Sequence, residues 1–220
     1  GPLGQGLANA VGCAIAEEYM GEVWGNSICD HYTYVIAGDG CLMEGISQEA
    51  ISLAGKLQLK KLIVIWDDNE ITIDGKVGLS CSTDQIARFQ SSGWSTFSCN
   101  AHNPLEIDRA IGEAKKDNRP SLIAAKSIIG YGSRTKQGTS SVHGAPLGKN
   151  EVEQIRNDFD WKHNEFEIPS DIKDAWEKVG NQNNRAFKDW TDRFQSLSEK
   201  KKTVFQNDLD QIFPAKLAQG

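Results

Sequence analysis

One stretch decides the fold of this chain: Tyr32-Thr33-Tyr34-Val35-Ile36-Ala37-Gly38-Asp39-Gly40. Residues 32–37 predict a buried strand, and Ile46, Ala50 and Leu53 then recur at helical spacing. The Gly-Asp-Gly tripeptide therefore lies where a strand ends and a helix is about to begin. In open parallel sheets, ligands bind at the carboxyl ends of strands. Glycines there let the backbone approach a phosphate, and a helix N-terminus offers unpaired N–H donors.

The same alternation continues on both sides of this stretch. Further strands are expected at residues 62–66, 95–98 and 121–129, and helices after the opening glycines and at residues 83–90 and 104–116. The nearly continuous apolar run at 62–66 suits a parallel strand that is covered on both faces. We therefore expect an α/β fold with a mostly parallel sheet, helices on both faces and right-handed crossovers.

The second half of the chain predicts a long loop and then helices. Residues 130–148 are rich in Gly, Ser and Thr, and a loop of this length is often functional. Asn150 and Glu153 match a capping box that would open a helix through Phe159. Beyond Ser170 the composition changes, and one helical stripe is aromatic or apolar: Phe187, Trp190, Phe194 and Leu197. We expect a domain over residues 1–169 and a helical extension over 170–220, with the stripe packed on the domain or, alternatively, on a further domain.

Composition excludes several classes of function. The 220 residues carry a formal net charge of -6, which argues against binding to nucleic acid or to a membrane surface. No apolar run approaches the ~20 residues of a membrane span. The five cysteines include no CxxC pair, which indicates free thiols in a reducing compartment, and the four histidines include no HxxxH pair that would favour zinc. A cytoplasmic location is expected.

The first residue is Gly, so we expect a longer protein, and a plastid targeting segment upstream would not be visible.

The carboxylate of Asp39 cannot itself attract a phosphate. It can do so through a divalent metal ion, because a hard cation bridges carboxylate and phosphate oxygens. Asn69 follows the predicted strand 62–66 and so can reach the same edge of the sheet, where its amide oxygen would be a second ligand. A lone Gly-Asp-Gly is an ordinary tight turn, whereas its pairing with an Asn after the next strand is far more specific.

Three further stretches accompany this pair. They are Gly1-Pro2-Leu3-Gly4-Gln5-Gly6, Asp67-Asp68-Asn69-Glu70-Ile71-Thr72-Ile73-Asp74-Gly75 and Ser141-Val142-His143-Gly144-Ala145-Pro146-Leu147-Gly148. Together with the stretch from Gly38 to Ser47, they resemble transketolase in order and spacing from residue 1 to about 169. The pyruvate-dehydrogenase and deoxyxylulose-phosphate-synthase relatives share the Gly-Asp-Gly and the Asn but are not expected to carry the His-Gly-Ala-Pro-Leu-Gly stretch.

The resemblance implies a thiamine diphosphate cofactor with Mg²⁺ (or Ca²⁺). The implied metal ligands are Asp39, Asn69 and the backbone carbonyl of Ile71. The implied cofactor-binding residues are Gly1, Pro2, Leu3, Gly40, Asn69 and His143, and His143 is also the implied catalytic residue. Glu44 resembles a carboxylate near the family's subunit contact, or it only favours the helix dipole. We expect His31, His102 and His163 to be structural or surface residues, and Asp67 and Asp68 to end a strand or support the metal ligands.

The implied function is transfer of a two-carbon ketol unit from a ketose phosphate to an aldose phosphate, in the pentose phosphate pathway or the Calvin cycle, by a homodimer. The glutamate that helps to form the reactive cofactor is expected in a pyrimidine-binding module outside this chain, so the chain alone is expected to be inactive. Two alternatives stay open: another thiamine-diphosphate ketol or acyl transferase, such as a dihydroxyacetone synthase, and a non-catalytic or split-enzyme subunit.

Overall fold

The structure, a computed structural model, describes residues 2–210. The chain divides into two compact units, one formed by residues 1–20 and 31–162 and the other by 21–30 and 163–220. The first helix, α1 (Gln5–Trp24), continues from one unit into the other.

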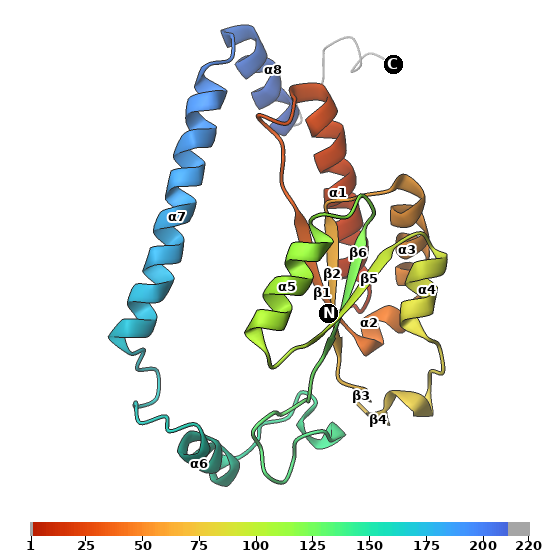
Figure 1. Ribbon diagram of the computed structural model, residues 1–220, viewed down its shortest axis with the longest axis vertical. Coiled ribbons are helices and arrows are strands. Elements are labelled where there is room, and N and C mark those ends of the chain that lie inside the picture. Colours follow the sequence, from red (N-terminus) through yellow and green to blue (C-terminus); the bar gives the residue numbers. More distant parts are fainter. Residues whose placement is uncertain (1, 211–220) are drawn as a thin grey trace. The chain divides into compact units, whose positions relative to one another are not determined.

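The first unit contains a four-stranded parallel sheet (Figure 1). Its strands are β1 (Thr33–Gly38), β2 (Leu62–Asp68), β5 (Ser95–Asn100) and β6 (Ser121–Lys126), in the order β1-β2-β6-β5. The register pairs Gly38 with Asp67, and Lys126 with both Asp68 and Asn100. All four strands therefore end at one edge of the sheet, which is where the sequence predicts the site.

Helices cover both faces of this sheet. Along β2, Leu62, Val64 and Trp66 join the core that packs under α1, α3 (Gly45–Leu57) and α4 (Gln85–Ser91). Ile63 and Ile65 point to the other face, where α5 (Pro104–Ala114) supplies Ala110 and Ala114. Each buried Leu, Ile or Val side chain contributes roughly 1.5–3 kcal/mol, so the alternating strand pattern stabilises the layers. The prediction of an α/β fold with a parallel sheet between helices is confirmed.

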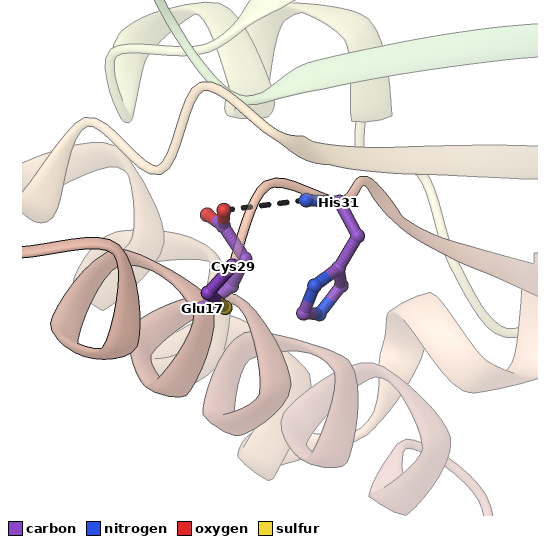
Figure 2. Close-up of side chains that lie close together, drawn as sticks. All are labelled: Glu17, Cys29 and His31. Carbon is purple, nitrogen blue, oxygen red and sulfur yellow. Dashed lines mark hydrogen bonds between the residues drawn. The ribbon is translucent and has the colours of Figure 1, made fainter. Parts of the chain in front are cut away.

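A buried carboxylate joins α1 to the sheet at the end opposite the site. Glu17 is 2% exposed. Its Oε1 accepts a hydrogen bond from the backbone N–H of His31 (Figure 2), with 3.3 Å between the two atoms. The same oxygen accepts a hydrogen bond from Nζ of Lys61, just before β2, at 2.7 Å. A carboxylate with such partners can be buried without a large desolvation cost.

Two strand predictions need correction. Residues 33–38 form a strand, but it lies at the edge of the sheet, and Tyr34 and Ile36 are 45% and 75% exposed, so the predicted burial is wrong. β6 ends at Lys126, not at residue 129, because neither β2 nor β5 offers a paired residue beyond the partners of Lys126. The residues after Lys126 therefore leave the sheet and run along its edge.

Two helix starts also differ from prediction. Residues 39–43 form a short helix, α2, that begins at Asp39 itself and precedes α3. The predicted capping box at Asn150 and Glu153 is wrong: α6 (Lys149–Asp158) has Gly148 as its N-cap, without a side-chain cap. Gly148 has a φ of 90°, a left-handed value that favours glycine, and it fixes the start of the helix instead.

Short elements connect these pieces. β3 (Ile71–Thr72) and β4 (Gly75–Lys76) form a small antiparallel hairpin, followed by a 3-10 turn, η1 (Val77–Leu79). A second 3-10 turn, η2 (Ser140–Val142), lies in the long loop before His143.

The second unit is helical. It contains α7 (Ser170–Gln195) and α8 (Glu199–Leu209), so the prediction of a helical C-terminal extension is confirmed. Nε1 of Trp190 donates to the carbonyl of Ile28 at 2.8 Å, and the ring of Phe205 lies 5.2 Å from Phe194 and 5.3 Å from Trp24. The predicted aromatic stripe thus packs on residues 21–30 and on α8. No described helix is long and apolar enough to cross a membrane.

Candidate cofactor and metal site

A cavity of about 890 Å³ opens at the carboxyl edge of the sheet. Its walls come from the β1–α2 turn, the end of β2 with the β3–β4 hairpin, the segment after β6 and the loop that carries His143. Six predicted site residues line it: Leu3, Asp39, Gly40, Asn69, Ile71 and His143. Pro2 is exposed and is not among the lining residues, and Gly1 lies outside the described residues. The structure thus brings together residues that are up to 140 positions apart.

Asp39 provides a buried negative charge with one oxygen to spare. The residue is 6% exposed, and its Oδ1 accepts a hydrogen bond from Nε1 of Trp66 at 3.1 Å. Its Oδ2 is buried and has no hydrogen-bond partner among the described residues. Burial raises the pKa of Asp39 to about 6, and the negative charges of Asp68 and Asp67 act in the same direction, against the Trp66 hydrogen bond and a smaller effect of the Glu70 backbone.

Such a group fits a divalent cation. An unpaired buried carboxylate oxygen is costly, and a hard cation bound to it would remove that cost. The neighbouring acidic side chains, which disfavour the ionised form of Asp39 by repulsion, would equally attract the cation.

Asn69, which lines the same cavity as Asp39, is held in a fixed orientation. Its Oδ1 accepts the backbone N–H of Ile71 at 2.9 Å, and its Nδ2 donates to Oδ2 of Asp67 at 3.0 Å. Glu70 between them has a φ of 60°, an uncommon left-handed value for a residue other than glycine. This turn sends the chain back over the end of β2, so that Ile71, which is 7% exposed, opens the hairpin inside the cavity wall.

The side chain of Glu70 is held by Lys126, the last residue of the neighbouring strand β6. Nζ of Lys126 donates to Oε1 of Glu70 at 2.6 Å and lies 3.4 Å from Oδ1 of Asp68. The hydrogen bond and charge of Lys126 hold the pKa of Glu70 below its usual value. The pair is largely exposed, so its contribution is to the path of the turn more than to stability.

The opening glycines place Leu3 against the Gly-Asp-Gly turn. Gly4 has a φ of 78°, and a Cβ there would lie 2.8 Å from Ile46 and Ser47, so only glycine fits. A Cβ on Gly40 would lie 3.3 Å from Cδ1 of Leu3. The backbone of residues 3–4 therefore reaches the junction of α2 and α3. The junction residue Glu44 is exposed, and nothing in the structure tests its predicted role.

His143 is exposed on the opposite wall, in a loop with several anchors. The carboxylate of Glu151 on α6 accepts hydrogen bonds from the hydroxyls of Ser133 and Thr135, and these bonds keep its pKa below the usual value. Nζ of Lys136 donates to the carbonyl of Leu147 at 2.8 Å. The loop that presents His143 is thus tied at both ends, although its sequence is rich in flexible residues.

Sequence reasoning did not connect three supporting residues to this site. Trp66 holds Asp39, Ser127 donates to Oδ1 of Asp67, and His102 accepts the N–H of Ile128 on Nε2 at 3.0 Å. Ser127 was missed because the predicted strand 121–129 included it, whereas the observed strand ends at Lys126 and leaves Ser127 at the edge of the sheet. His102 stacks on Tyr131 with 3.9 Å between ring centroids, a contact between residues that no spacing rule connects.

Comparison with known proteins identifies the family. Residues 1–217 match the family described as "Transketolase, thiamine diphosphate binding domain". The chain belongs to the transketolase family. It is 49% identical over 218 residues to a transketolase of Rhodobacter capsulatus, covering 99% of this chain and 32% of the relative, and 53% identical over 196 residues to one of Cereibacter sphaeroides, covering 89% and 30%.

Solved transketolases share the fold. A transketolase of Pichia stipitis in complex with sedoheptulose 7-phosphate superimposes with a TM-score of 0.90 at 39% identity, covering 96% of this chain and 32% of that one. The Campylobacter jejuni transketolase gives a TM-score of 0.90 at 36% identity, covering 94% and 33%. This chain therefore spans about a third of the length of its relatives, and it corresponds to their thiamine diphosphate binding domain.

Proposed function

We propose that this chain is the diphosphate- and metal-binding part of a transketolase that transfers a two-carbon ketol unit from a ketose phosphate to an aldose phosphate. The observation that carries the proposal is the buried Oδ2 of Asp39, which has no hydrogen-bond partner among the described residues, in a cavity shared with Asn69. The family match adds thiamine diphosphate as the cofactor. The Pichia stipitis enzyme bound to sedoheptulose 7-phosphate supports sugar phosphates as the substrates.

Oxygen ligands would hold Mg²⁺ or Ca²⁺. We assign Asp39 by its carboxylate, Asn69 by the second lone pair of its Oδ1, and Ile71 by its carbonyl, which are the ligand types that hard cations prefer. The N–H groups at the start of α2, including that of Gly40, would donate to the diphosphate. Pro2, Leu3 and, outside the described residues, Gly1 would contact the ring portion of the cofactor.

The cofactor, when bound, supplies the electron sink for the carbanion. The chain's own contribution is binding and orientation. His143 would donate a hydrogen bond to the diphosphate or to the oxygen of the substrate that changes charge. Ile129 and Val142 line the cavity and would exclude water beside the reacting atoms.

The whole protein is proposed to contain more than residues 1–220. Residues 1–169 form the proposed diphosphate and metal domain, and residues 170–220 the extension toward a pyrimidine-binding module that supplies the missing glutamate. A homodimer in the cytoplasm is proposed from the family resemblance. We also propose that the isolated chain has no ketol-transfer activity, because it would provide one side of the cofactor cleft.

Calorimetry tests the proposal directly. Thiamine diphosphate should bind with Mg²⁺ and lose most of its affinity without the metal or in Asp39→Ala, since both changes leave the diphosphate charge uncompensated. Equal affinity of wild type and Asp39→Ala would refute the assignment. A coupled assay with the complementary module, comparing ribose 5-phosphate with formaldehyde as acceptor, separates a transketolase from a dihydroxyacetone synthase. Binding without turnover under these conditions would indicate a non-catalytic subunit.

A further inference from the structure

Asp67 lies at the centre of a small hydrogen-bond network at the edge of the sheet. It is the sixth residue of β2 and pairs in register with Gly38 of the Gly-Asp-Gly turn. Its two oxygens have different partners: Oδ1 accepts from the hydroxyl of Ser127, and Oδ2 accepts from Nδ2 of Asn69 at 3.0 Å. Ser127 begins the segment after β6 that forms the far wall of the cavity. One carboxylate therefore joins Asn69 to that wall.

The network allows only one orientation of the Asn69 amide. A carboxylate only accepts hydrogen bonds, so the group that faces Asp67 must be the NH₂ of Asn69. A backbone N–H only donates, so the group that faces Ile71 must be Oδ1. Rotating the amide by half a turn would set oxygen against carboxylate and NH₂ against N–H. Both hydrogen bonds would be replaced by repulsive contacts.

We propose that Asp67 is a positioning residue that keeps the amide oxygen of Asn69 available as a metal ligand. The proposal rests on the proposed function, in which Asn69 binds the cation. Without Asp67, the two orientations of the amide would become closer in energy, and one of them would present NH₂ where a cation needs oxygen. Ligand-orienting partners of this kind typically change metal affinity about 10–100-fold.

Two other roles for Asp67 are weaker. As a direct charged ligand Asp67 is a weaker choice than Asp39, because both of its oxygens accept a hydrogen bond, whereas Oδ2 of Asp39 has no partner among the described residues. A carboxylate that only ends a strand would need no partner on Asn69. The neighbouring Asp68 is a carboxylate of this kind: it is the last residue of β2, and its side chain lies near Lys126. It therefore provides a matched control.

The first experiment measures metal binding in the complete enzyme, this chain together with its pyrimidine-binding module. Mn²⁺ replaces Mg²⁺ as a probe that is visible by electron paramagnetic resonance, with thiamine diphosphate present. Asp67→Ala should weaken Mn²⁺ binding about 10–100-fold, clearly more than Asp68→Ala, which removes an equal charge near Asp39 and so measures the effect of charge alone. Equal effects of the two substitutions would overturn the inference. If wild type itself binds no Mn²⁺ with thiamine diphosphate, the proposed function fails instead, and the second experiment still tests the orientation.

The second experiment exchanges the two side chains and needs no metal. Asn69→Asp sets two carboxylates against each other and should lower the melting temperature. Adding Asp67→Asn reverses the polarity of the hydrogen bond. The new amide at position 67 would still accept from Ser127 and would now donate to the new carboxylate at position 69, which keeps an oxygen for the Ile71 N–H. The melting temperature should rise again by about 2 °C or more.

The control for this exchange is Asp67→Ala combined with Asn69→Asp. It removes the repulsion between the two carboxylates without supplying a donor, so it should not give full recovery. If it recovers as well as the exchanged pair, the hydrogen bond is not what matters, and the inference is wrong.

Discussion

Nε1 of Trp66 donates a hydrogen bond to Oδ1 of Asp39 at 3.1 Å, which leaves Oδ2 of the same carboxylate buried without a partner among the described residues. The indole fixes the carboxylate through one oxygen and leaves the other for the proposed cation. The binding group is therefore arranged before the ligand arrives, and the protein without ligand retains an uncompensated charge. Stability and binding make opposite demands on this residue.

Asp39→Asn should have opposite effects on stability and on cofactor binding. The amide keeps an oxygen for Trp66 and removes the buried charge, so the ligand-free protein should become more stable by about 0.5–2 kcal/mol at neutral pH. Binding of thiamine diphosphate with Mg²⁺ should be lost, because a charged ligand is gone. Denaturant melts without ligand and calorimetry with it measure the two effects. Asp74→Asn in the exposed hairpin turn should change neither, and a less stable Asp39→Asn protein would contradict the argument.

Glu151→Gln should reveal the anchor of the His143 loop through its pH dependence. Ser133 and Thr135 hold the pKa of Glu151 below the value of 4.5 expected in an unfolded chain. The ionised carboxylate therefore adds stability that is present above about pH 4.5 and is lost as the pH falls through its lower folded pKa. At pH 7 the melting temperature of wild type should be higher than that of Glu151→Gln, and this gap between the two melting temperatures should close in acid.

The control for this prediction is Glu153→Gln. Glu153 lies on the same helix but is exposed, and the structure gives it no hydrogen bond to another described side chain, so its replacement should leave the pH profile unchanged. A Glu151→Gln gap that is constant from pH 7 to pH 3 would show that ionisation of this carboxylate does not matter.

The regular part of the fold could be predicted because it follows from periodicity. The apolar run of β2 and the spacing of α3 and α5 are local patterns, and each led to the observed element within a few residues. The errors occur where distant contacts decide. The sequence at Asn150 and Glu153 matches a capping box, yet α6 starts at Lys149 after the N-cap Gly148, and Glu151 bonds to Ser133 and Thr135, eighteen and sixteen residues earlier. Local rules contain no information about such partners.

In the candidate site, too, local motifs predicted some residues, and contacts between distant residues were not predicted. Asp39, Asn69 and His143 could be named from motifs, and all three line one cavity. The hydrogen bond from Trp66 to Asp39 and the stacking of His102 on Tyr131 could not be predicted from motifs, because both contacts depend on which strands are neighbours in the sheet. Sequence reasoning treated His102 as structural or surface, and its exposure agrees with that, but its contact with Ile128 brings it to the edge of the cavity.

His102→Phe should loosen that edge while keeping the aromatic stack. Phenylalanine can still lie on Tyr131 but cannot accept the N–H of Ile128. The lost hydrogen bond should cost about 0.5–1.5 kcal/mol and speed hydrogen exchange at the Ile128 amide up to about tenfold. His102→Ala, which removes the stack as well, should have a larger effect on stability. Unchanged exchange at Ile128 in His102→Phe would mean that the imidazole does not hold this segment.

His143→Ala tests whether this side chain acts in the reaction or only binds the cofactor. The residue is exposed on the cavity wall, and its loop is anchored through Glu151 and Lys136, so removing the imidazole should leave the fold intact. An interaction made mainly in the transition state lowers kcat, whereas one made equally with the bound cofactor lowers only affinity. We expect kcat of the complete enzyme to fall about 10–100-fold, the range for one hydrogen bond to a charged group. The affinity for thiamine diphosphate should change much less. His143→Asn, which keeps a donor, should be intermediate, and His163→Ala in the helical unit should behave as wild type. If kcat at saturating cofactor is unchanged and only the cofactor requirement rises, His143 is a binding residue, and the catalytic role proposed for it is wrong.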